Sequence, residues 1–198
     1  MTAFLCCLAG FVLGSLPFSV WLVRWFRHAD VRRVGDGNPG AVNAWSAGGW
    51  RIGVSALLLD VAKGAAAPAA ARLALGVEGW ALVPVALAPL VGHAFSPWLG
   101  FRGGKGIAST FGVWTALTAW LVPTTLGVAL LAFLAVQSAS AWTVLFAAVV
   151  AFAVLAAVRP DAPLLAALAA NIALLAWTHR RELRSPPRFH APGRKKKG

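Results

Sequence analysis

The sequence predicts an all-α integral membrane protein with about seven transmembrane helices. Its 198 residues are 59% hydrophobic and only 12% charged, which is too apolar for a soluble domain of this length. The apolar runs are long enough to cross a bilayer, and residues 108–158 contain no charged side chain. We therefore expect a single transmembrane helical domain over residues 1–180. A basic tail over residues 181–198 is expected to be disordered.

Seven apolar segments are expected to form the transmembrane helices. In chain order they cover residues 3–23, 52–75, 80–99, 107–122, 124–137, 141–158 and 162–178. The stretch GSLP (14–17) is expected to bend the first span, and breaks are predicted at Pro123 and at QSAS (137–140). Residues 24–51 are expected to be a polar loop. No internal repeat is evident, which disfavours transporter folds built from duplicated halves.

Positive charge is concentrated in three segments. The formal net charge is +12, and 15 of the 18 Lys and Arg lie in residues 24–51, in residues 101–106 or after residue 179. If these segments share one face, the positive-inside rule makes that face cytoplasmic, with the N-terminus outside and the C-terminus cytoplasmic. Topology then explains the charge, and no soluble module remains to bind nucleic acid. The expected partner of the basic tail is membrane lipid.

The turn FRGGKG contains three glycines and two cations: Arg102, Gly103, Gly104, Lys105 and Gly106. Glycines allow consecutive backbone N–H groups to point into one concavity, and the next span adds its free N-terminal N–H groups. Lys105 supplies a full positive charge and Arg102 a bidentate fork. The turn therefore predicts an anion site, with phosphate as the favoured ligand. The alternative is a tight interhelical turn with positive-inside cations.

This turn is not the Walker A loop of an ATPase. Leu99 stands where that motif requires a glycine, and Gly106 replaces the Ser or Thr that would reach Mg²⁺. No cluster of Cys, His and carboxylates has metal-ligand spacing either, so we expect no metal ion and no cofactor.

Three ionisable residues lie within the predicted spans. Asp60 and Lys63 are three residues apart on one helix and share a face, so they either pair with each other or orient a polar substrate. His93 lies near the cytoplasmic end of its span. It is either a structural hydrogen-bonding residue or a direct participant in the chemistry.

Further uncommon residues lie in the other two polar segments. The stretch GDGNPGAVN holds Asn38, Gly40 and Asn43, and WTHRRELR holds His179 and Arg180. Three polar segments that meet at one membrane face are typical of a site on the cytoplasmic side rather than of a transmembrane pore.

Four stretches together resemble one family. They are GSLPF, GNPGAVN, LLLDVAKG and GHAFSPWLGFRGGKGIAS, and their order and spacing are similar to those of the bacterial acyl-phosphate-dependent glycerol-3-phosphate acyltransferases. The similarity covers roughly residues 10–112 well and the remainder only in layout. The resemblance implies a multi-pass enzyme of the bacterial inner membrane with three cytoplasmic motifs.

The resemblance also implies the reaction. Members of this family transfer a fatty acyl group from acyl phosphate to the 1-hydroxyl of glycerol 3-phosphate, and they release phosphate and lysophosphatidic acid without coenzyme A. No cofactor is implied, and we expect a monomer. The alternative is a divergent member that lacks this activity and acts as a lipid-binding or membrane partner protein.

The family motifs match this chain unevenly. The second motif is carried over intact to His93, Phe95, Gly103, Gly104, Lys105 and Gly106, with Arg102 for the family's usual Lys. In the first motif Asn38, Gly40 and Asn43 match, whereas Asp36, Val42 and Ser46 replace Ser, Thr and Arg. In the third motif His179 and Arg180 match, and Glu182 stands where Asn is expected.

These matches assign roles to the candidate residues. The expected catalytic residues are Asn38, Asn43, His93 and His179. The expected substrate-binding residues are Gly40, Asp60, Lys63, Arg102, Gly103, Gly104, Lys105, Gly106 and Arg180. In this hypothesis the glycine turn holds the phosphate of either substrate, and Asn38 and Asn43 donate hydrogen bonds to the acyl phosphate or its carbonyl.

Overall fold

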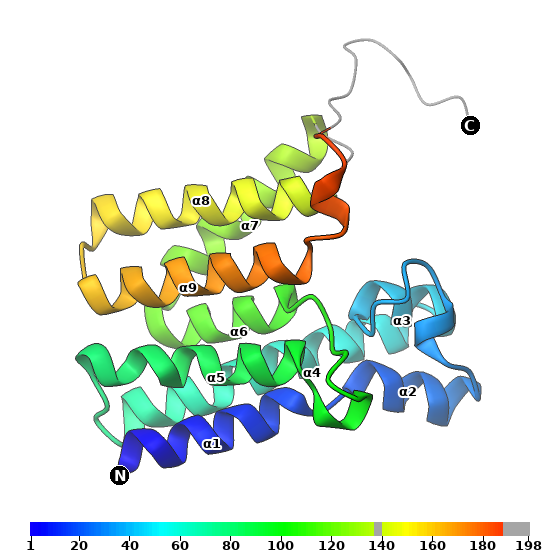
Figure 1. Cartoon of the computed structure of the whole chain (residues 1–198), viewed down its shortest axis with the longest axis horizontal. Helices are drawn as coiled ribbons and strands as arrows, with labels where there is room; N and C mark the ends of the chain where they lie inside the picture. Colours follow the sequence, from blue (N-terminus) through cyan, green and yellow to red (C-terminus); the bar gives the residue numbers. More distant parts are fainter. Residues whose placement is uncertain (137–139, 188–198) are drawn as a thin grey trace.

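The structure is a computed structural model that describes residues 1–136 and 140–187, and every regular element in this part of the chain is helical (Figure 1). The α-helices are α1 (Thr2–Ser15), α2 (Phe18–Arg27), α3 (Ala41–Gly48), α4 (Trp50–Ala69), α5 (Leu82–Ala94), α6 (Ile107–Thr118), α7 (Leu121–Val136), α8 (Ser140–Val158) and α9 (Ala162–Thr178). The predicted all-α class is confirmed.

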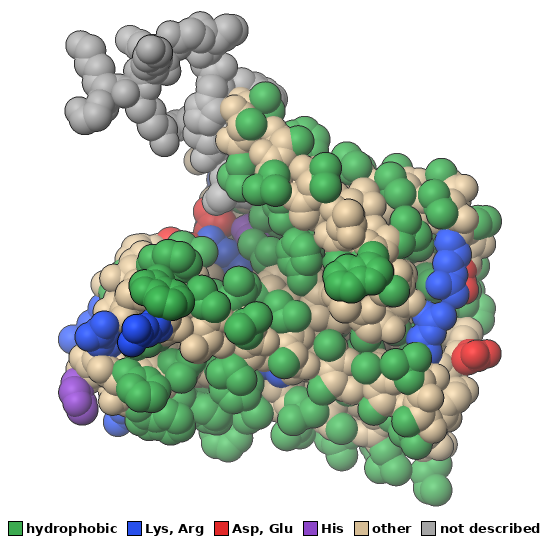
Figure 2. All heavy atoms as spheres, turned by 180° about the vertical axis from the view of Figure 1, so that it is seen from behind, with side chains coloured by type: hydrophobic (Ala, Val, Ile, Leu, Met, Phe, Trp, Pro, Cys, Tyr) green, Lys and Arg blue, Asp and Glu red, His purple; other side chains and the backbone are tan. Residues whose placement is uncertain are grey.

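Apolar helices form the body of the molecule. Four helical stretches are long and apolar enough to cross a membrane: Thr2–Arg27, Trp50–Ala74, Gly79–Leu99 and Ala141–Val158. The helices α6, α7 and α9 are apolar but shorter. Successive long helices run in opposite directions and pack side by side (Figure 1). Hydrophobic side chains cover most of the broad face in Figure 2, and the charged side chains gather mainly towards its two ends.

Glycines let the helices approach closely. A side chain at Gly14 of α1 would collide with the backbone of Pro89 in α5, and one at Gly112 of α6 would collide with the carbonyl of Val61 in α4. Close contact between backbones is a main source of helix association in membranes, where lipid removes most of the hydrophobic drive between helices. The α1–α5 and α4–α6 pairs are therefore held by small residues.

The predicted bend in the first span is confirmed. The helix α1 ends at Ser15 and α2 begins at Phe18, so the break falls at Leu16 and Pro17. Two carbonyl groups near the break then accept hydrogen bonds from elsewhere in the fold. Ser15 accepts from Ser96 Oγ at 2.6 Å, and Leu16 accepts from Lys63 Nζ at 2.6 Å.

Two predicted boundaries are wrong. The break expected at Pro123 occurs earlier, because α6 ends at Thr118 and Ala119 has a φ of 51°. Pro123 lies in the first turn of α7, where a helix does not need the missing N–H. The expected polar loop over 24–51 also contains the helix α3, which the sequence analysis did not predict.

Two other predictions fall partly on residues that the structure does not describe. Residues 137–139 of the predicted QSAS break lie outside the described residues. In the predicted tail, Glu182–Arg184 form a short 3-10 turn, and residues 188–198 lie outside the described residues.

Candidate functional site

A cavity of about 430 Å³ lies at the end of the bundle where three polar segments meet. The segments are the loop 36–39, the glycine turn and the end of α9. The polar side chains that line the cavity are Asp36, Asn38, Arg102, Lys105, Thr178, Arg180, Arg181 and Glu182. The predicted convergence of the three segments is thus confirmed.

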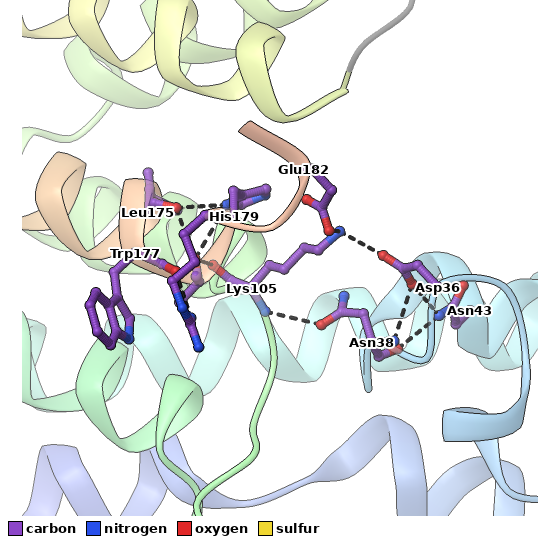
Figure 3. A network of polar contacts seen from close by, with 10 residues as sticks. Asp36, Asn38, Asn43, Lys105, Leu175, Trp177, His179 and Glu182 are labelled. Atoms are coloured by element: carbon purple, nitrogen blue, oxygen red, sulfur yellow. Dashed lines mark hydrogen bonds and ion pairs between the residues drawn. The ribbon is translucent and has the colours of Figure 1, made fainter. Parts of the chain in front are cut away.

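Lys105 joins the three segments (Figure 3). Its Nζ atom lies 2.6 Å from Asp36 Oδ2 and 3.0 Å from Glu182 Oε1. Its backbone N–H donates to Asn38 Oδ1 at 3.1 Å, and its carbonyl accepts from Thr178 Oγ1 at 3.0 Å. One residue of the glycine turn therefore fixes both neighbouring segments through its side chain and its backbone.

The loop before α3 is held by its own polar groups. Asp36 Oδ1 accepts from the Asn38 N–H at 3.1 Å and from Asn43 Nδ2 at 2.7 Å. Asn43 Nδ2 also donates to the Asn38 carbonyl at 3.0 Å. Gly40 donates its N–H to the same carbonyl at 2.8 Å, and it leaves room for the Asn38 side chain.

Asn43, predicted as a hydrogen-bond donor to substrate, donates within its own loop in this structure. An amide nitrogen carries two hydrogens, and both are used within the loop. Asn43 is buried and does not line the cavity. It orients Asp36 instead, whereas Asn38 does line the cavity.

The ion pair between Asp36 and Lys105 shifts both groups towards their charged forms. Partial burial raises the pKa of Asp36, but hydrogen bonds from Lys105, Asn38 and Asn43 outweigh it and lower this pKa to about 2. Burial lowers the pKa of Lys105, but Asp36 and Glu182 outweigh it, so this pKa is raised. Both side chains are therefore ionised at neutral pH.

The backbone N–H groups of the glycine turn do not point into one concavity, the arrangement that the sequence analysis expected for an anion site. The N–H of Gly103 donates to the Ala94 carbonyl at 3.0 Å, and that of Gly104 donates to the His93 carbonyl at 3.1 Å. With the Lys105 N–H on Asn38, three consecutive N–H groups are used within the protein. In this structure these three groups are therefore directed at the protein and not into the cavity.

The positions require glycine for a steric and conformational reason instead. The turn runs directly against the end of α5, and a side chain at Gly103 would collide with the His93 carbonyl. A side chain at Gly104 would collide with the His93 ring, and Gly106 has a φ of 87° where α6 begins. The positive charge of the cavity therefore comes from side chains.

Asp60, Lys63 and His93 form a buried cluster behind the glycine turn. Lys63 Nζ lies 2.8 Å from Asp60 Oδ1, and His93 Nδ1 lies 3.8 Å from the same oxygen. Ser109 Oγ is 3.3 Å from His93 Nδ1. These side chains are buried and do not line the cavity. The structure therefore favours the ion-pair interpretation of Asp60 and Lys63 and the structural interpretation of His93.

The end of α9 supplies one buried and one exposed candidate. His179 is buried, its Nδ1 lies 2.8 Å from the Leu175 carbonyl, and it does not line the cavity. Burial lowers its pKa, so the ring is neutral at pH 7. Arg180 does line the cavity. Its guanidinium carbon lies 4.5 Å from the centre of the Trp177 ring, and its Nη1 donates to the Trp177 carbonyl at 2.8 Å.

Four polar residues that line the cavity were not predicted as site residues from the sequence: Asp36, Thr178, Arg181 and Glu182. Glu182 was noted only as a departure from the family motif, although it is the second carboxylate on Lys105. The available signal was an acidic residue directly after the basic pair of the third motif. Within residues 1–136 and 140–187, no group of three or more His, Cys, Asp or Glu is arranged to hold a metal ion.

Comparison with known proteins gives concordant results. The family described as glycerol-3-phosphate acyltransferase matches residues 4–185. A glycerol-3-phosphate acyltransferase from Synechococcus sp. (strain JA-2-3B'a(2-13)) is 42% identical over 185 residues, which are 92% of this chain and 90% of the relative. One from Anaeromyxobacter sp. (strain Fw109-5) is 47% identical over 115 residues, which are 57% of each chain.

A solved structure has the same fold. The crystal structure of PlsY (YgiH), an integral membrane glycerol 3-phosphate acyltransferase in its glycerol 3-phosphate form, matches with a TM-score of 0.85. It is 29% identical, and the match covers 93% of this chain and 91% of that one.

Proposed function

The chain belongs to the glycerol-3-phosphate acyltransferase family, and from that premise we propose that its acyl donor is an acyl phosphate. The protein is an integral membrane acyltransferase that converts glycerol 3-phosphate to lysophosphatidic acid in phospholipid synthesis. This activity agrees with the resemblance of the motifs and not with the alternative of an inactive lipid-binding homologue.

The cavity lining carries the donor proposal. Its described residues include four cations but no Ser, Cys or His. The one hydroxyl, that of Thr178, donates to the Lys105 carbonyl. A covalent acyl-enzyme therefore has no activated nucleophile here. An acyl phosphate is already an activated anhydride, so positioning and charge stabilisation suffice for direct transfer.

The side chains that line the cavity suit the chemical groups of both substrates. Arg102, Lys105 and Arg180 bind the phosphate groups through charge-assisted hydrogen bonds, and Arg181 adds positive charge. Asn38 Nδ2 donates to the reacting carbonyl oxygen, which gains negative charge as the hydroxyl attacks. Phe101 and Trp177 line the cavity and are exposed, so they offer apolar surface to the acyl chain.

The reaction is then a single acyl transfer. The 1-hydroxyl of glycerol 3-phosphate attacks the carbonyl carbon, and the bond from that carbon to the phosphate oxygen breaks after the new ester bond forms. The hydroxyl proton ends on the released phosphate, whose oxygens are far more basic than the Asp36 carboxylate, because hydrogen bonds lower the pKa of Asp36 to about 2. Asn43, His93 and His179 support the walls of the cavity in this mechanism.

We further propose seven membrane crossings in a bacterial inner membrane. The four long and three shorter apolar helical segments, found within residues 1–136 and 140–187, support this number. The basic segments meet at the cavity end, and the positive-inside rule favours placing that end in the cytoplasm, with the N-terminus outside. We also propose an active monomer, because the three polar segments of the cavity already meet within a single chain.

The donor is tested with purified protein in lipid vesicles. Glycerol 3-phosphate is supplied with palmitoyl phosphate or, separately, with palmitoyl-CoA, and the release of lysophosphatidic acid is followed. We expect turnover with palmitoyl phosphate only, with one phosphate released per lysophosphatidic acid formed. Turnover with palmitoyl-CoA alone would contradict the proposed donor.

A further inference from the structure

The ammonium group of Lys105 already contacts two carboxylates, although the cavity is proposed to bind phosphate. This group has three donors, and Asp36 Oδ2 at 2.6 Å and Glu182 Oε1 at 3.0 Å take two of them. By the resemblance described in the sequence analysis, both acidic residues stand where uncharged residues, Ser and Asn, are expected. The two departures therefore meet at a single atom, and each affects how Lys105 is presented.

The two carboxylates are held very differently. Asp36 uses both of its oxygens, because Oδ1 accepts from Asn38 and Asn43 while Oδ2 contacts Lys105. Glu182 has the longer contact with Lys105, through Oε1 alone. Its Oε2 atom is buried and has no hydrogen-bond partner among the described residues. An unsatisfied buried carboxylate oxygen is unfavourable, so leaving this position relieves a penalty.

The segment that carries Asp36 is also held more firmly than the segment that carries Glu182. Asp36 lies in a loop that is fixed by Asn43 and by the start of α3. Glu182 lies at the start of a three-residue 3-10 turn after α9. Both side chains are partly exposed, 38% for Glu182 and 45% for Asp36, so the difference between them lies in how each is held within its own segment.

We propose that a substrate phosphate group displaces Glu182 from Lys105 while Asp36 stays in place. The carboxylate of Glu182 occupies the position on the ammonium group that a phosphate oxygen takes, and it closes the cavity towards anions when no substrate is bound. This inference rests on the proposed function, in which Lys105 binds a substrate phosphate. Glu182 is thus a positioning residue that competes with the substrate, and its removal increases affinity.

Binding measurements on the full-length protein in nanodiscs test the displacement. The dissociation constant of glycerol 3-phosphate is measured by calorimetry without any acyl donor, and that of a non-hydrolysable alkyl phosphonate analogue of the acyl phosphate is measured separately. Glu182→Gln keeps the size of the side chain and removes the charge. We expect it to tighten binding about three- to fivefold, the range of a partly exposed ion pair, for whichever compound places its phosphate on Lys105.

Two matched variants separate displacement from general repulsion. Asp36→Asn removes the same charge from the neighbourhood of the same ammonium group. We expect no tighter binding, because in the wild type Asp36 stays bound to its loop when the phosphate binds and so does not compete with it. Glu78→Gln removes one charge at the opposite end of the molecule and should leave both dissociation constants unchanged. Equal tightening by Glu182→Gln and Asp36→Asn would overturn the proposal, since it indicates repulsion of anions by both carboxylates. Unchanged or weaker binding by Glu182→Gln would also overturn it.

Lys105→Ala distinguishes this inference from the function on which it rests. If Lys105→Ala leaves the binding of both compounds intact, the phosphate role of Lys105 and the displacement fail together. If Lys105→Ala loses binding and Glu182→Gln does not tighten it, only the displacement fails. Thermal unfolding of each variant ensures that folded proteins are compared.

Discussion

The Nζ atom of Lys63 lies 2.6 Å from the carbonyl oxygen of Leu16, at the break between α1 and α2. The same atom pairs with Asp60 at 2.8 Å. Lys63→Met should leave the buried Asp60 carboxylate without its cation and lower the free energy of unfolding by about 3–5 kcal/mol. The double variant Lys63→Met, Asp60→Asn should recover part of this loss. Chemical unfolding in mild detergent measures both, and an unchanged single variant would contradict a stabilising pair.

Gly104 lies against the ring of His93, on the side of the turn that faces the buried cluster. Gly104→Ala should push the turn into the cavity and reduce kcat/KM at least about tenfold, because small misplacements of binding groups are costly. Gly127→Ala in α7 is the control, since its new methyl group meets only ordinary contacts with Phe111. Steady-state kinetics with acyl phosphate check both variants. Equal activity in the two would mean that the close approach at Gly104 is unimportant.

Composition and the lengths of the apolar runs were sufficient for the helical membrane fold and for most helix positions. The long apolar runs have no other stable arrangement in lipid, because every backbone group must be paired within the segment. The exception at Pro123 arose because a proline in the first turn of a helix looks the same in sequence as one between helices. The helix α3 was missed because it is only eight residues long and lies in a stretch rich in glycine.

The site could be located from sequence, but its internal contacts could not. Clustered glycines and cations marked the right segments, and these do line one cavity. The pairing of Lys105 with Glu182, however, joins residues far apart in the chain. The glycines of the turn were attributed to anion binding, whereas they permit the turn to pack against His93. Spacing alone does not distinguish these two uses of glycine.

The ion pair of Asp36 predicts a defined loss of stability in acid. Its pKa in the folded protein is about 2, lower than the ordinary value of 3.8, so the pair stabilises the fold fully above about pH 4. This contribution is lost as the pH falls from about 4 to about 2. Because Asp36 is partly exposed, its share is below about 1 kcal/mol. Thermal unfolding between pH 6 and pH 2.5 should show a smaller acid-induced decrease in Tm for Asp36→Asn than for the wild type. An identical decrease would mean that Asp36 does not stabilise the fold.

Arg102 lines the cavity and is exposed, and it has no carboxylate partner among the described residues. It is therefore free to bind a substrate phosphate with its guanidinium fork. Arg102→Ala should raise the KM for the substrate it binds about 10- to 100-fold, the value of a hydrogen bond to a charged group, and change kcat less. Arg102→Lys keeps the positive charge and should recover most of the affinity. Arg33→Ala, an exposed cation outside the cavity, should leave KM unchanged. If Arg102→Ala lowered kcat with KM unchanged, Arg102 would act in the transition state and not in phosphate binding.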